Sequence, residues 1–460
     1  MKFRDLPLVA ELVAALGASN VLQDDAALAP YRRDRSPYPE IDPGIVVTPN
    51  TVDEISKVLH LANSCRNPVI VRGGGFSMTG FLQPTPHRAI ILDTRRLNRV
   101  LEINEVNMTV TAEAGVIMSE LDARVAARGF EVQTVGVPIQ HTTLGGVLSG
   151  VVGGGLPRDS GASGTTGRQL VDLKVALADG SLLRTNAGGA NVSRRASSIQ
   201  GGDGPFLTAA FVGDGGSFGV KVEATLQITP AAPHVASGQW LLEDLDSVWR
   251  ALAQLAAVRE TPYTGIGIAE GTPWAVHFTA RASRPDILAL YVRSVERVLE
   301  ACGGRPDPSD TSALPSRDWF VNVDRAVVAF IFGRAQFLKA FEHIRTMLDQ
   351  RIRERHLSAL GIGVKIFIYP HTRHAIYTSI SILFERTVPE GQAKAVALAT
   401  ETYELVVALG GHLEPHQGVA SRIMAQAWSP NYRRVFLGLK SAVDPNHILN
   451  PGLWGVVEEV

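Results

Sequence analysis

Glycines crowd one stretch of the chain, and hydroxyl-bearing residues stand among them. The stretch from Gly136 to Gly161 holds eight glycines in 26 residues, together with Thr142, Thr143 and Ser149. Glycine has no Cβ and adopts positive φ, so its backbone N–H groups can approach an anion and turn around it. Uncharged hydroxyl and amide donors suit a diphosphate held by many hydrogen bonds. Because this glycine density is too high for a helix or strand, the stretch predicts a loop that cradles phosphate.

Two further glycine loops accompany this stretch. A short β-branched run at Val69–Arg72 leads into Gly73–Gly75, and another glycine loop lies at Gly213–Gly219. A solvated linker is the alternative for the long stretch, but apolar residues run through it, which a linker would lack. The chain has no G-x-G-x-x-G motif and no Gly-Lys pair, which argues against a Rossmann NAD site and a P-loop. We therefore expect a phosphate site built from loops between strands.

One later segment, Tyr369 to Tyr377, carries residues that could bind an anion or move a proton. Strand alternation sends Arg373 and Tyr377 to one face and His374 to the other. A guanidinium can bind a carboxylate with two parallel hydrogen bonds, so Arg373 is the candidate clamp. The plain alternatives are a histidine in a turn and a tyrosine that packs in a sheet.

A second segment, Gly411 to Gly418, contains Glu414 and His416. A carboxylate and an imidazole are the side chains that most often accept or donate a proton in catalysis. These two residues complete the candidate catalytic set of Arg373, His374, Tyr377, Glu414 and His416.

The first half of the chain predicts the elements that hold the glycine loops. Helical spacing of apolar residues covers 7–17, 52–62 and 119–129, and strands are expected at 69–72, 90–93, 108–115 and 219–228. Residues 170–185 predict a β-hairpin that turns at Asp179-Gly180, a pair typical of a type I′ turn. The composition changes after Pro230, where we place a domain boundary.

The middle of the chain predicts a different unit. Strands are expected at 274–280 and in two segments of 364–386, and helices at 287–301, 335–356 and 393–409. Long strands with intervening helices indicate an antiparallel sheet covered by helices, so the fold class is α+β. The predicted domains are 1–230, 231–412 and a C-terminal segment, 413–460, that returns to the first domain.

Composition limits the partners. A chain of 460 residues predicts two or three domains of about 150 residues each, and 45% apolar content is typical of a globular protein. The net charge of −1 favours neither nucleic acid nor an anionic membrane as a partner. Cys65 and Cys302 form no motif and read as reduced core thiols. With no signal peptide or membrane span in the sequence, we expect a cytoplasmic protein, and we consider a homodimer as its assembly.

Five segments together carry a family resemblance. Residues 71–80, 136–146, 170–185, 204–230 and 444–452 resemble the FAD-linked oxidases of the vanillyl-alcohol oxidase and D-lactate dehydrogenase superfamily, whose FAD-binding domain is of the PCMH type. The resemblance implies a two-part FAD-binding domain and a substrate cap domain over the flavin ring. It also implies the cofactor-binding residues, which are Arg72, Gly73, Gly74, Gly75, Phe76, Ser77, Gly80, Pro138, Thr142, Thr143, Gly145, Gly146, Ser149, Gly155, Gly219, Val220 and Asn450.

The resemblance implies an FAD-dependent oxidoreductase that transfers a hydride from a small alcohol or 2-hydroxy acid to the flavin, with oxygen or another molecule as electron acceptor. The alternatives are a metal-assisted D-2-hydroxy-acid dehydrogenase, an oxidase of para-substituted phenols or benzylic alcohols, and a flavin-carrying subunit of a larger complex. Metal-dependent members use two histidines seven apart, whereas His371 and His374 are three apart, so no metal is expected. Covalent members carry a histidine or cysteine where this chain has Phe76, Val137 and Ile139, so we expect FAD to be bound non-covalently.

Overall fold

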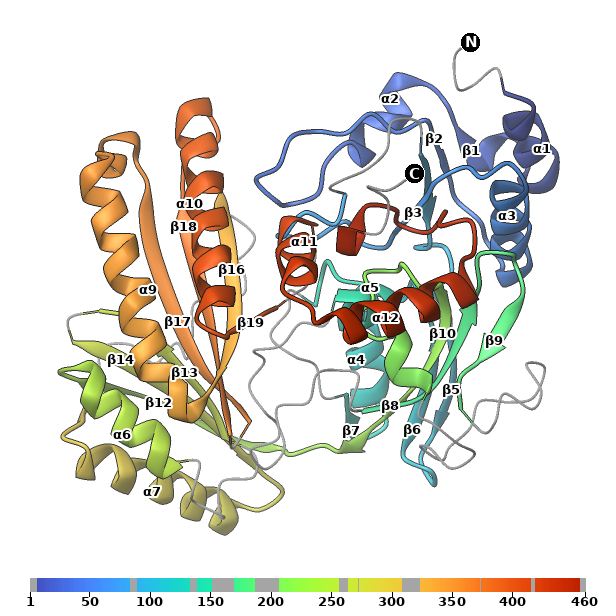
Figure 1. Ribbon diagram of the computed structural model, residues 1–460. Helices are drawn as coiled ribbons and strands as arrows, with labels where there is room; N and C mark the ends of the chain where they lie inside the picture. Colours follow the sequence, from blue (N-terminus) through green and yellow to red (C-terminus); the bar gives the residue numbers. More distant parts are fainter. Residues whose placement is uncertain are drawn as a thin grey trace.

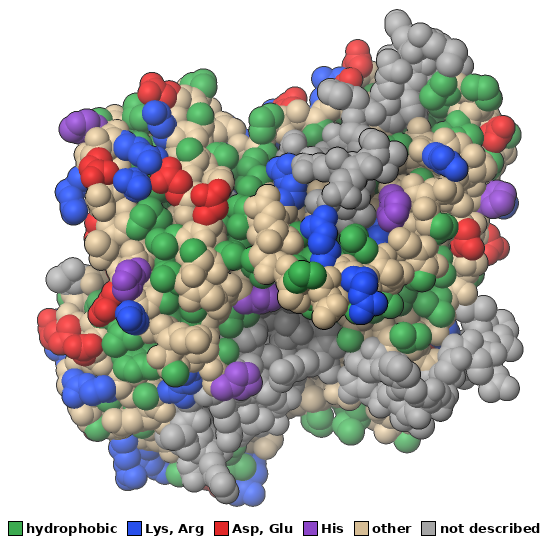
Figure 2. All heavy atoms as spheres, viewed as in Figure 1, with side chains coloured by type: hydrophobic (Ala, Val, Ile, Leu, Met, Phe, Trp, Pro, Cys, Tyr) green, Lys and Arg blue, Asp and Glu red, His purple; other side chains and the backbone are tan. Residues whose placement is uncertain are grey.

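The computed structural model describes residues 6–82, 89–132, 139–150, 169–186, 207–255, 264–271, 273–307, 323–372, 374–414 and 418–455. These residues form two lobes that lie side by side (Figure 1). The first lobe contains the residues before 231 together with 418–455, and the second lobe contains residues 234–413. In Figure 2, Lys/Arg and Asp/Glu side chains are interspersed over the visible face of the second lobe.

The first lobe begins with a four-stranded sheet in the order β1-β2-β4-β3. The strands are β1 (Val21–Leu22), β2 (Ile45–Val47), β4 (Ile90–Asp93) and β3 (Val69–Arg72), and β4 runs parallel to both β2 and β3. Leucines of α1 (Pro7–Leu16) and the apolar side of α3 (Val52–Ser64) pack against one face. The short helix α2 (Asp25–Leu28) contributes to the core on the other face. Both faces of the sheet are therefore buried.

A five-stranded antiparallel sheet completes the first lobe, in the order β5-β6-β10-β8-β9. The strands are β5 (Val100–Asn104), β6 (Thr109–Glu113), β10 (Val220–Gln227), β8 (Leu170–Ala176) and β9 (Leu182–Arg184). The helices α4 (Met118–Ala126) and α5 (Leu144–Gly150) share a core with this sheet, and α12 (Pro430–Val443) adds Phe436 and Val443. A two-stranded pair, β7 (Phe130–Glu131) with β11 (Thr229–Pro230), lies where the chain leaves for the second lobe.

Two local predictions in the first lobe are wrong. Residues 144–150 form helix α5 although glycines are dense there, because Leu144, Val147 and Leu148 recur at helical spacing and are buried. The hairpin of β8 and β9 is present, but its turn is not type I′, since only Gly180 of the predicted pair has positive φ (+87°). The N–H of Gly180 donates to the Leu177 carbonyl, which is the pattern of a type I turn followed by a left-handed glycine.

The second lobe is an eight-stranded antiparallel sheet in the order β15-β12-β14-β13-β17-β18-β16-β19. Its strands are β12 (His234–Leu242), β13 (Thr264–Ala269), β14 (Trp274–Ala282), β15 (Arg305–Pro306), β16 (Arg325–Gly333), β17 (Gly363–Thr372), β18 (Ala375–Leu383) and β19 (His412–Leu413). The helices α6 (Leu245–Leu255), α7 (Pro285–Ala301), α9 (Arg334–Glu354) and α10 (Pro389–Ala408) bury their apolar sides in one core with the sheet. The α+β prediction is confirmed.

The opposite face of this sheet carries aromatic and small apolar side chains that meet the first lobe. Val327, Phe367, Tyr369 and Tyr377 form a buried cluster, and Met78 of the first lobe packs against it. The helix α11 (Gly418–Gln426) precedes α12 and packs against α10. No helix among the described residues is long and apolar enough to cross a membrane. Cys302 is buried as predicted, but Cys65 is exposed at the end of α3, so the prediction of a core thiol there is wrong.

Candidate functional site

The first glycine loop begins where β3 ends. Arg72 closes the strand, and its guanidinium donates hydrogen bonds to the Arg33 carbonyl (3.1 Å) and the Pro30 carbonyl (3.1 Å). Burial lowers the pKa of Arg72. Gly75 has φ +68°, and a Cβ there would overlap with the Arg72 guanidinium. The loop therefore turns tightly under a fixed cation.

The first two glycine segments lie directly against each other. A Cβ on Gly73 would overlap with the Thr143 hydroxyl, and a Cβ on Gly74 would overlap with the His141 carbonyl. The Phe76 ring stacks on the His141 ring with centroids 5.2 Å apart. Only glycine fits at this contact, because a side chain would push the two loops apart.

The third glycine loop, Gly213–Gly219, is organised by one carboxylate. Asp214 accepts hydrogen bonds from the N–H groups of Gly216 (3.0 Å) and Phe218 (3.1 Å), and its Oδ1 lies 2.5 Å from the Nζ of Lys221. Gly219 lies against Val175, where a Cβ would overlap with the Val175 methyl group. The third loop thus brings its backbone, and the buried Lys221 that follows it, to the same cavity as the other two loops.

All three glycine loops line one cavity, which the sheet of the second lobe closes from the other side. From the loops, the lining includes Gly73, Ser77, Thr143, Ser149, Gly216 and Lys221. From the second lobe, it includes Arg325, Val327, Tyr369, Tyr377 and Ser379. The cavity therefore has one wall with backbone and hydroxyl donors and the Lys221 ammonium, and an opposite wall with one guanidinium and two phenols.

The guanidinium in the second wall belongs to Arg325, the first residue of β16. Its side chain is buried, with 3% of the residue exposed, and its Nη2 lies 2.9 Å from the Sδ of Met78. Burial lowers the pKa of Arg325 to about 10, so the side chain still carries a positive charge at neutral pH. This places a cation in a site from which most water is excluded, where it attracts an anion more strongly than at the surface.

The two phenols of this wall, Tyr369 and Tyr377, face each other across β17 and β18 with ring centroids 6.0 Å apart. Burial raises the pKa of both hydroxyl groups, and the nearby Glu414 carboxylate adds to the effect on Tyr377. Both tyrosines therefore remain neutral hydrogen-bond donors at neutral pH.

The structure separates the predicted catalytic residues. Tyr377 lines the cavity, and Glu414 is buried next to β16, where its N–H donates to the Ala329 carbonyl. His374 is exposed at the turn between β17 and β18 and does not line the cavity. Arg373 and His416 lie outside the described residues. Among the residues described, no group of His, Cys, Asp and Glu could hold a metal ion. The side chain of His371 and the residue His416 lie outside the described part of the chain.

Most predicted cofactor residues that the structure describes line the cavity. These are Arg72, Gly73, Gly74, Gly75, Phe76, Ser77, Thr142, Thr143, Gly145, Gly146, Ser149 and Gly219. Gly80, Val220 and Asn450 lie outside the cavity lining, and Asn450 instead joins β3 to the third loop from behind. Pro138 and Gly155 fall outside the residues that the structure describes.

Sequence reasoning missed three charged residues of the cavity lining, which are the cations Arg325 and Lys221 and the carboxylate Asp34. Arg325 opens the apolar run RAVVAFIFG, and a charge at the edge of a buried strand is a signal that could have identified it. Lys221 interrupts the alternating strand after the third glycine loop and is 3% exposed. Both belong to the small class of buried cations that proteins retain when a partner is at hand.

Two family models match the chain. The FAD binding domain matches residues 43–186, and the C-terminal domain of FAD linked oxidases matches residues 335–453. The first match contains the first two glycine segments of the cavity. The second contains β17, β18 and all but the last residue of the C-terminal tail, by which we mean residues 440–454.

Relatives match over nearly the whole chain. The glycolate oxidase subunit GlcD of Bacillus subtilis is 24% identical over 468 residues, which cover 96% of this chain and 95% of that protein. An uncharacterized FAD-linked oxidoreductase of Mycobacterium tuberculosis is 26% identical over 489 residues, covering 97% and 98% of the two chains. Among solved structures, 4-ethylphenol oxidase from Gulosibacter chungangensis has a TM-score of 0.81 at 19% identity and covers 98% of this chain and 96% of its own.

Proposed function

The chain belongs to the FAD-linked oxidases, and we propose that it oxidises a small 2-hydroxy acid whose carboxylate is bound by Arg325. The cofactor is FAD, and the residues of the cavity suit it. Where Gly73 and Gly74 meet the second loop, the lining offers backbone N–H groups and the hydroxyls of Thr142 and Thr143, which is the donor set that a diphosphate needs. When bound, the flavin accepts the hydride that the substrate loses.

Arg325 is the observation that carries the proposal. It is buried on the wall opposite the glycine loops, so a molecule between the two walls would meet the guanidinium. The planar fork of arginine makes two parallel hydrogen bonds to a carboxylate and fixes its orientation. With a pKa of about 10, Arg325 is positively charged at neutral pH, where a substrate carboxylate is ionised.

The neighbouring groups would orient and deprotonate the substrate hydroxyl. Tyr369 and Tyr377 keep their protons because burial raises their pKa values, so they donate hydrogen bonds to substrate oxygens. We infer that the hydroxyl proton of the substrate passes to the Tyr377 oxygen while the Tyr377 proton passes toward Glu414. Glu414 lies near enough to raise the pKa of Tyr377, so it is the carboxylate placed to receive that proton, while the raised pKa means that Tyr377 keeps its own proton until the substrate supplies another.

The relatives support the same substrate class, since a glycolate oxidase subunit matches over nearly its full length. Because that relative is named as a subunit, the alternative that this chain works within a larger complex stays open. The electron acceptor of the reaction would be oxygen or another molecule.

A second candidate is the oxidation of a para-substituted phenol. A buried guanidinium with two tyrosine hydroxyls would also stabilise a phenolate, and 4-ethylphenol oxidase shares the fold. The apolar side chain of Val327 beside these groups suits an aromatic ring.

One experiment separates the candidates. The purified protein is mixed without oxygen with small 2-hydroxy acids, with the matching neutral alcohols and with para-alkyl phenols, and the flavin absorbance is followed. We expect 2-hydroxy acids to bleach the flavin at the lowest concentrations. Bleaching by phenols alone would favour the second candidate, and bleaching by neutral alcohols as readily as by hydroxy acids would contradict a carboxylate site. No bleaching by any of them would favour the subunit alternative.

A further inference from the structure

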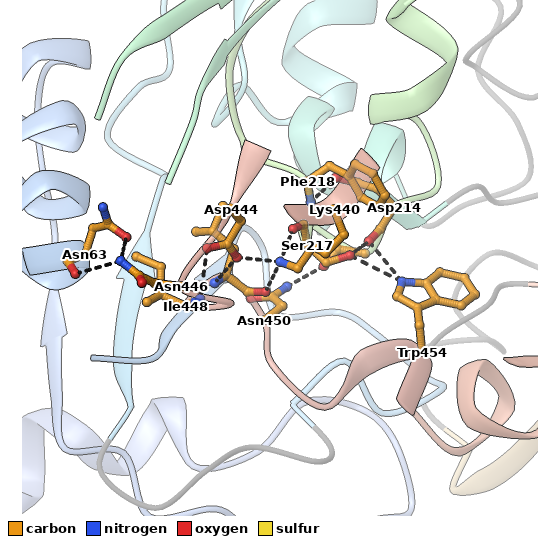
Figure 3. A network of polar contacts seen from close by, with 12 residues as sticks. Asn63, Asp214, Ser217, Phe218, Lys440, Asp444, Asn446, Ile448, Asn450 and Trp454 are labelled. Carbon is orange, nitrogen blue, oxygen red and sulfur yellow. Dashed lines mark hydrogen bonds and ion pairs between the residues drawn. The ribbon is translucent and has the colours of Figure 1, made fainter. Parts of the chain in front are cut away.

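The third glycine loop is held from behind by the C-terminal tail of the chain (Figure 3). Lys440, near the end of α12, donates a hydrogen bond from Nζ to the Ser217 carbonyl (2.5 Å) in that loop. The same Nζ donates to the Leu449 carbonyl (3.1 Å) and lies 2.5 Å from Asp444 Oδ2. One side chain therefore joins the loop, the helix and the turn that follows it.

Lys440 and Asp444 are both buried, with 2% and 0% of the residue exposed. Burial lowers the pKa of Lys440, while the Asp444 carboxylate opposes that effect. Asp444 also accepts hydrogen bonds from the N–H groups of Ile448 (3.0 Å) and Leu449 (2.9 Å). The Lys440–Asp444 pair is therefore fixed in position, because moving either group away from its partners would leave a buried charge without compensation.

Two other tail residues bind the same loop. Asn450 accepts a hydrogen bond from the Val71 N–H (2.9 Å) at the end of β3 and donates one to the Gly215 carbonyl. Trp454 donates from its indole nitrogen to the Ser217 hydroxyl (3.3 Å). The tail thus fixes the third loop relative to the strand that leads into the first loop.

The other side of the third loop faces the cavity. Gly215, Gly216 and Lys221 line the cavity, and Lys221 is paired with Asp214 within the loop. Ser217, whose carbonyl accepts the Lys440 hydrogen bond, directly follows the cavity-lining Gly216 and stands two residues before the cavity-lining Gly219. Lys440 itself is not part of the cavity lining.

We propose that Lys440 is a positioning residue for FAD. It holds residues 213–219 in the conformation that the cofactor binds, so the protein does not have to order this loop when FAD enters. A loop that must be ordered on binding lowers the affinity by the cost of that ordering. The inference rests on the FAD site alone and is independent of the proposed substrate.

The test compares four variants by flavin affinity and by local hydrogen exchange. Lys440→Met keeps the length of the side chain and removes the contacts to Ser217 and Asp444. The double variant Lys440→Met/Asp444→Asn also removes the contacts but leaves no unbalanced charge. Asp444→Asn alone keeps the Lys440 bond to Ser217. Arg434→Met changes an exposed cation on the same helix and is the matched control.

We expect Lys440→Met and the double variant to bind FAD at least about tenfold more weakly than wild type, the loss of one buried charged hydrogen bond. In their FAD-free forms, the amides of residues 213–219 should exchange faster, while those of β6, β8 and β10 keep their protection. Asp444→Asn should lose less affinity, and Arg434→Met none.

The double variant decides the outcome even where Lys440→Met does not fold, because its buried site is neutral. Wild-type FAD affinity in the double variant would overturn the proposal, since it would assign any loss in Lys440→Met to the unbalanced Asp444 charge. Equal loss of exchange protection in the loop and in the five-stranded sheet would also overturn it, because Lys440 would then support the whole lobe.

Discussion

Replacement of Arg325 by methionine tests the proposed substrate site, and it should affect activity and stability in opposite directions. Methionine is similar in length and apolar, so it fills the same space next to Met78 and the two tyrosines without a charge. In the wild type, the guanidinium is almost completely buried.

The structure gives a size for both effects. Loss of one partner of a buried charged pair costs about 2 to 5 kcal/mol, which corresponds to a fall of about 30-fold to 4,000-fold in kcat/KM for a carboxylate substrate. Burial lowers the pKa of Arg325 to about 10, a fall of about 2.5, and each pKa unit is worth about 1.4 kcal/mol. Burial disfavours the charged form, which is the form present at neutral pH, so the folded protein carries a penalty of about 3 kcal/mol there, and Arg325→Met should remove much of it.

The assay measures kcat and KM for a 2-hydroxy acid and for the matching neutral alcohol, together with the urea midpoint of the FAD-free protein. We expect a large loss for the acid, little change for the alcohol and a higher urea midpoint. Arg334→Met is the control, because Arg334 begins α9 and its guanidinium donates to the Leu252 carbonyl, away from the cavity. Unchanged kcat/KM for the acid, or equal losses for acid and alcohol, would refute the carboxylate site.

Three further predictions concern the cofactor wall and the tyrosines. Gly145→Val should lower the flavin content, because even a Cβ there would lie 2.9 Å from the Ala114 Cβ; a folded variant with stoichiometric flavin would count against this. Tyr377→Phe should reduce kcat by about tenfold or more with little change in KM, since a general acid–base contribution is lost; unchanged kcat would remove Tyr377 from the proton path. Acid precipitation should leave the yellow colour in the supernatant, because we expect FAD to be bound non-covalently; colour in the pellet would show a covalent bond.

The periodicity of the sequence predicted the fold well where elements have one polar and one apolar side. The helices α1, α3 and α4 and the hairpin of β8 and β9 all lie where their apolar spacing placed them. The pattern was weaker in the second lobe, where the strands β12, β13 and β16 were not predicted. β16 is buried along almost its whole length, so it shows no alternation of polar and apolar residues.

The same reason explains which site residues were found. The glycine loops carry a local signal, because close backbone contacts such as that of Gly74 with His141 tolerate only glycine. Arg325 carries only a weak local signal, a charge at the start of an apolar run, and its place in the site depends on the pairing of β16 with β18, the strand of Tyr377. The predicted clamp at Arg373 stays a prediction, because that residue lies outside the described part of the chain. A long-range pairing of this kind cannot be read from spacing along the chain.

The tail that closes the first lobe also sets the order in which the protein can be completed during synthesis. Val69 donates a hydrogen bond to the Ile448 carbonyl and accepts one from the Asn450 N–H, so the edge of the first sheet is finished by residues made after the whole second lobe. Residues 234–413, by contrast, pair only among themselves in their sheet and leave the ribosome earlier. Since domains tend to fold as they emerge, the second lobe can fold while the first still waits for its final strand partner. A chain that ends before residue 440 should therefore contain a folded second lobe attached to an incomplete first one.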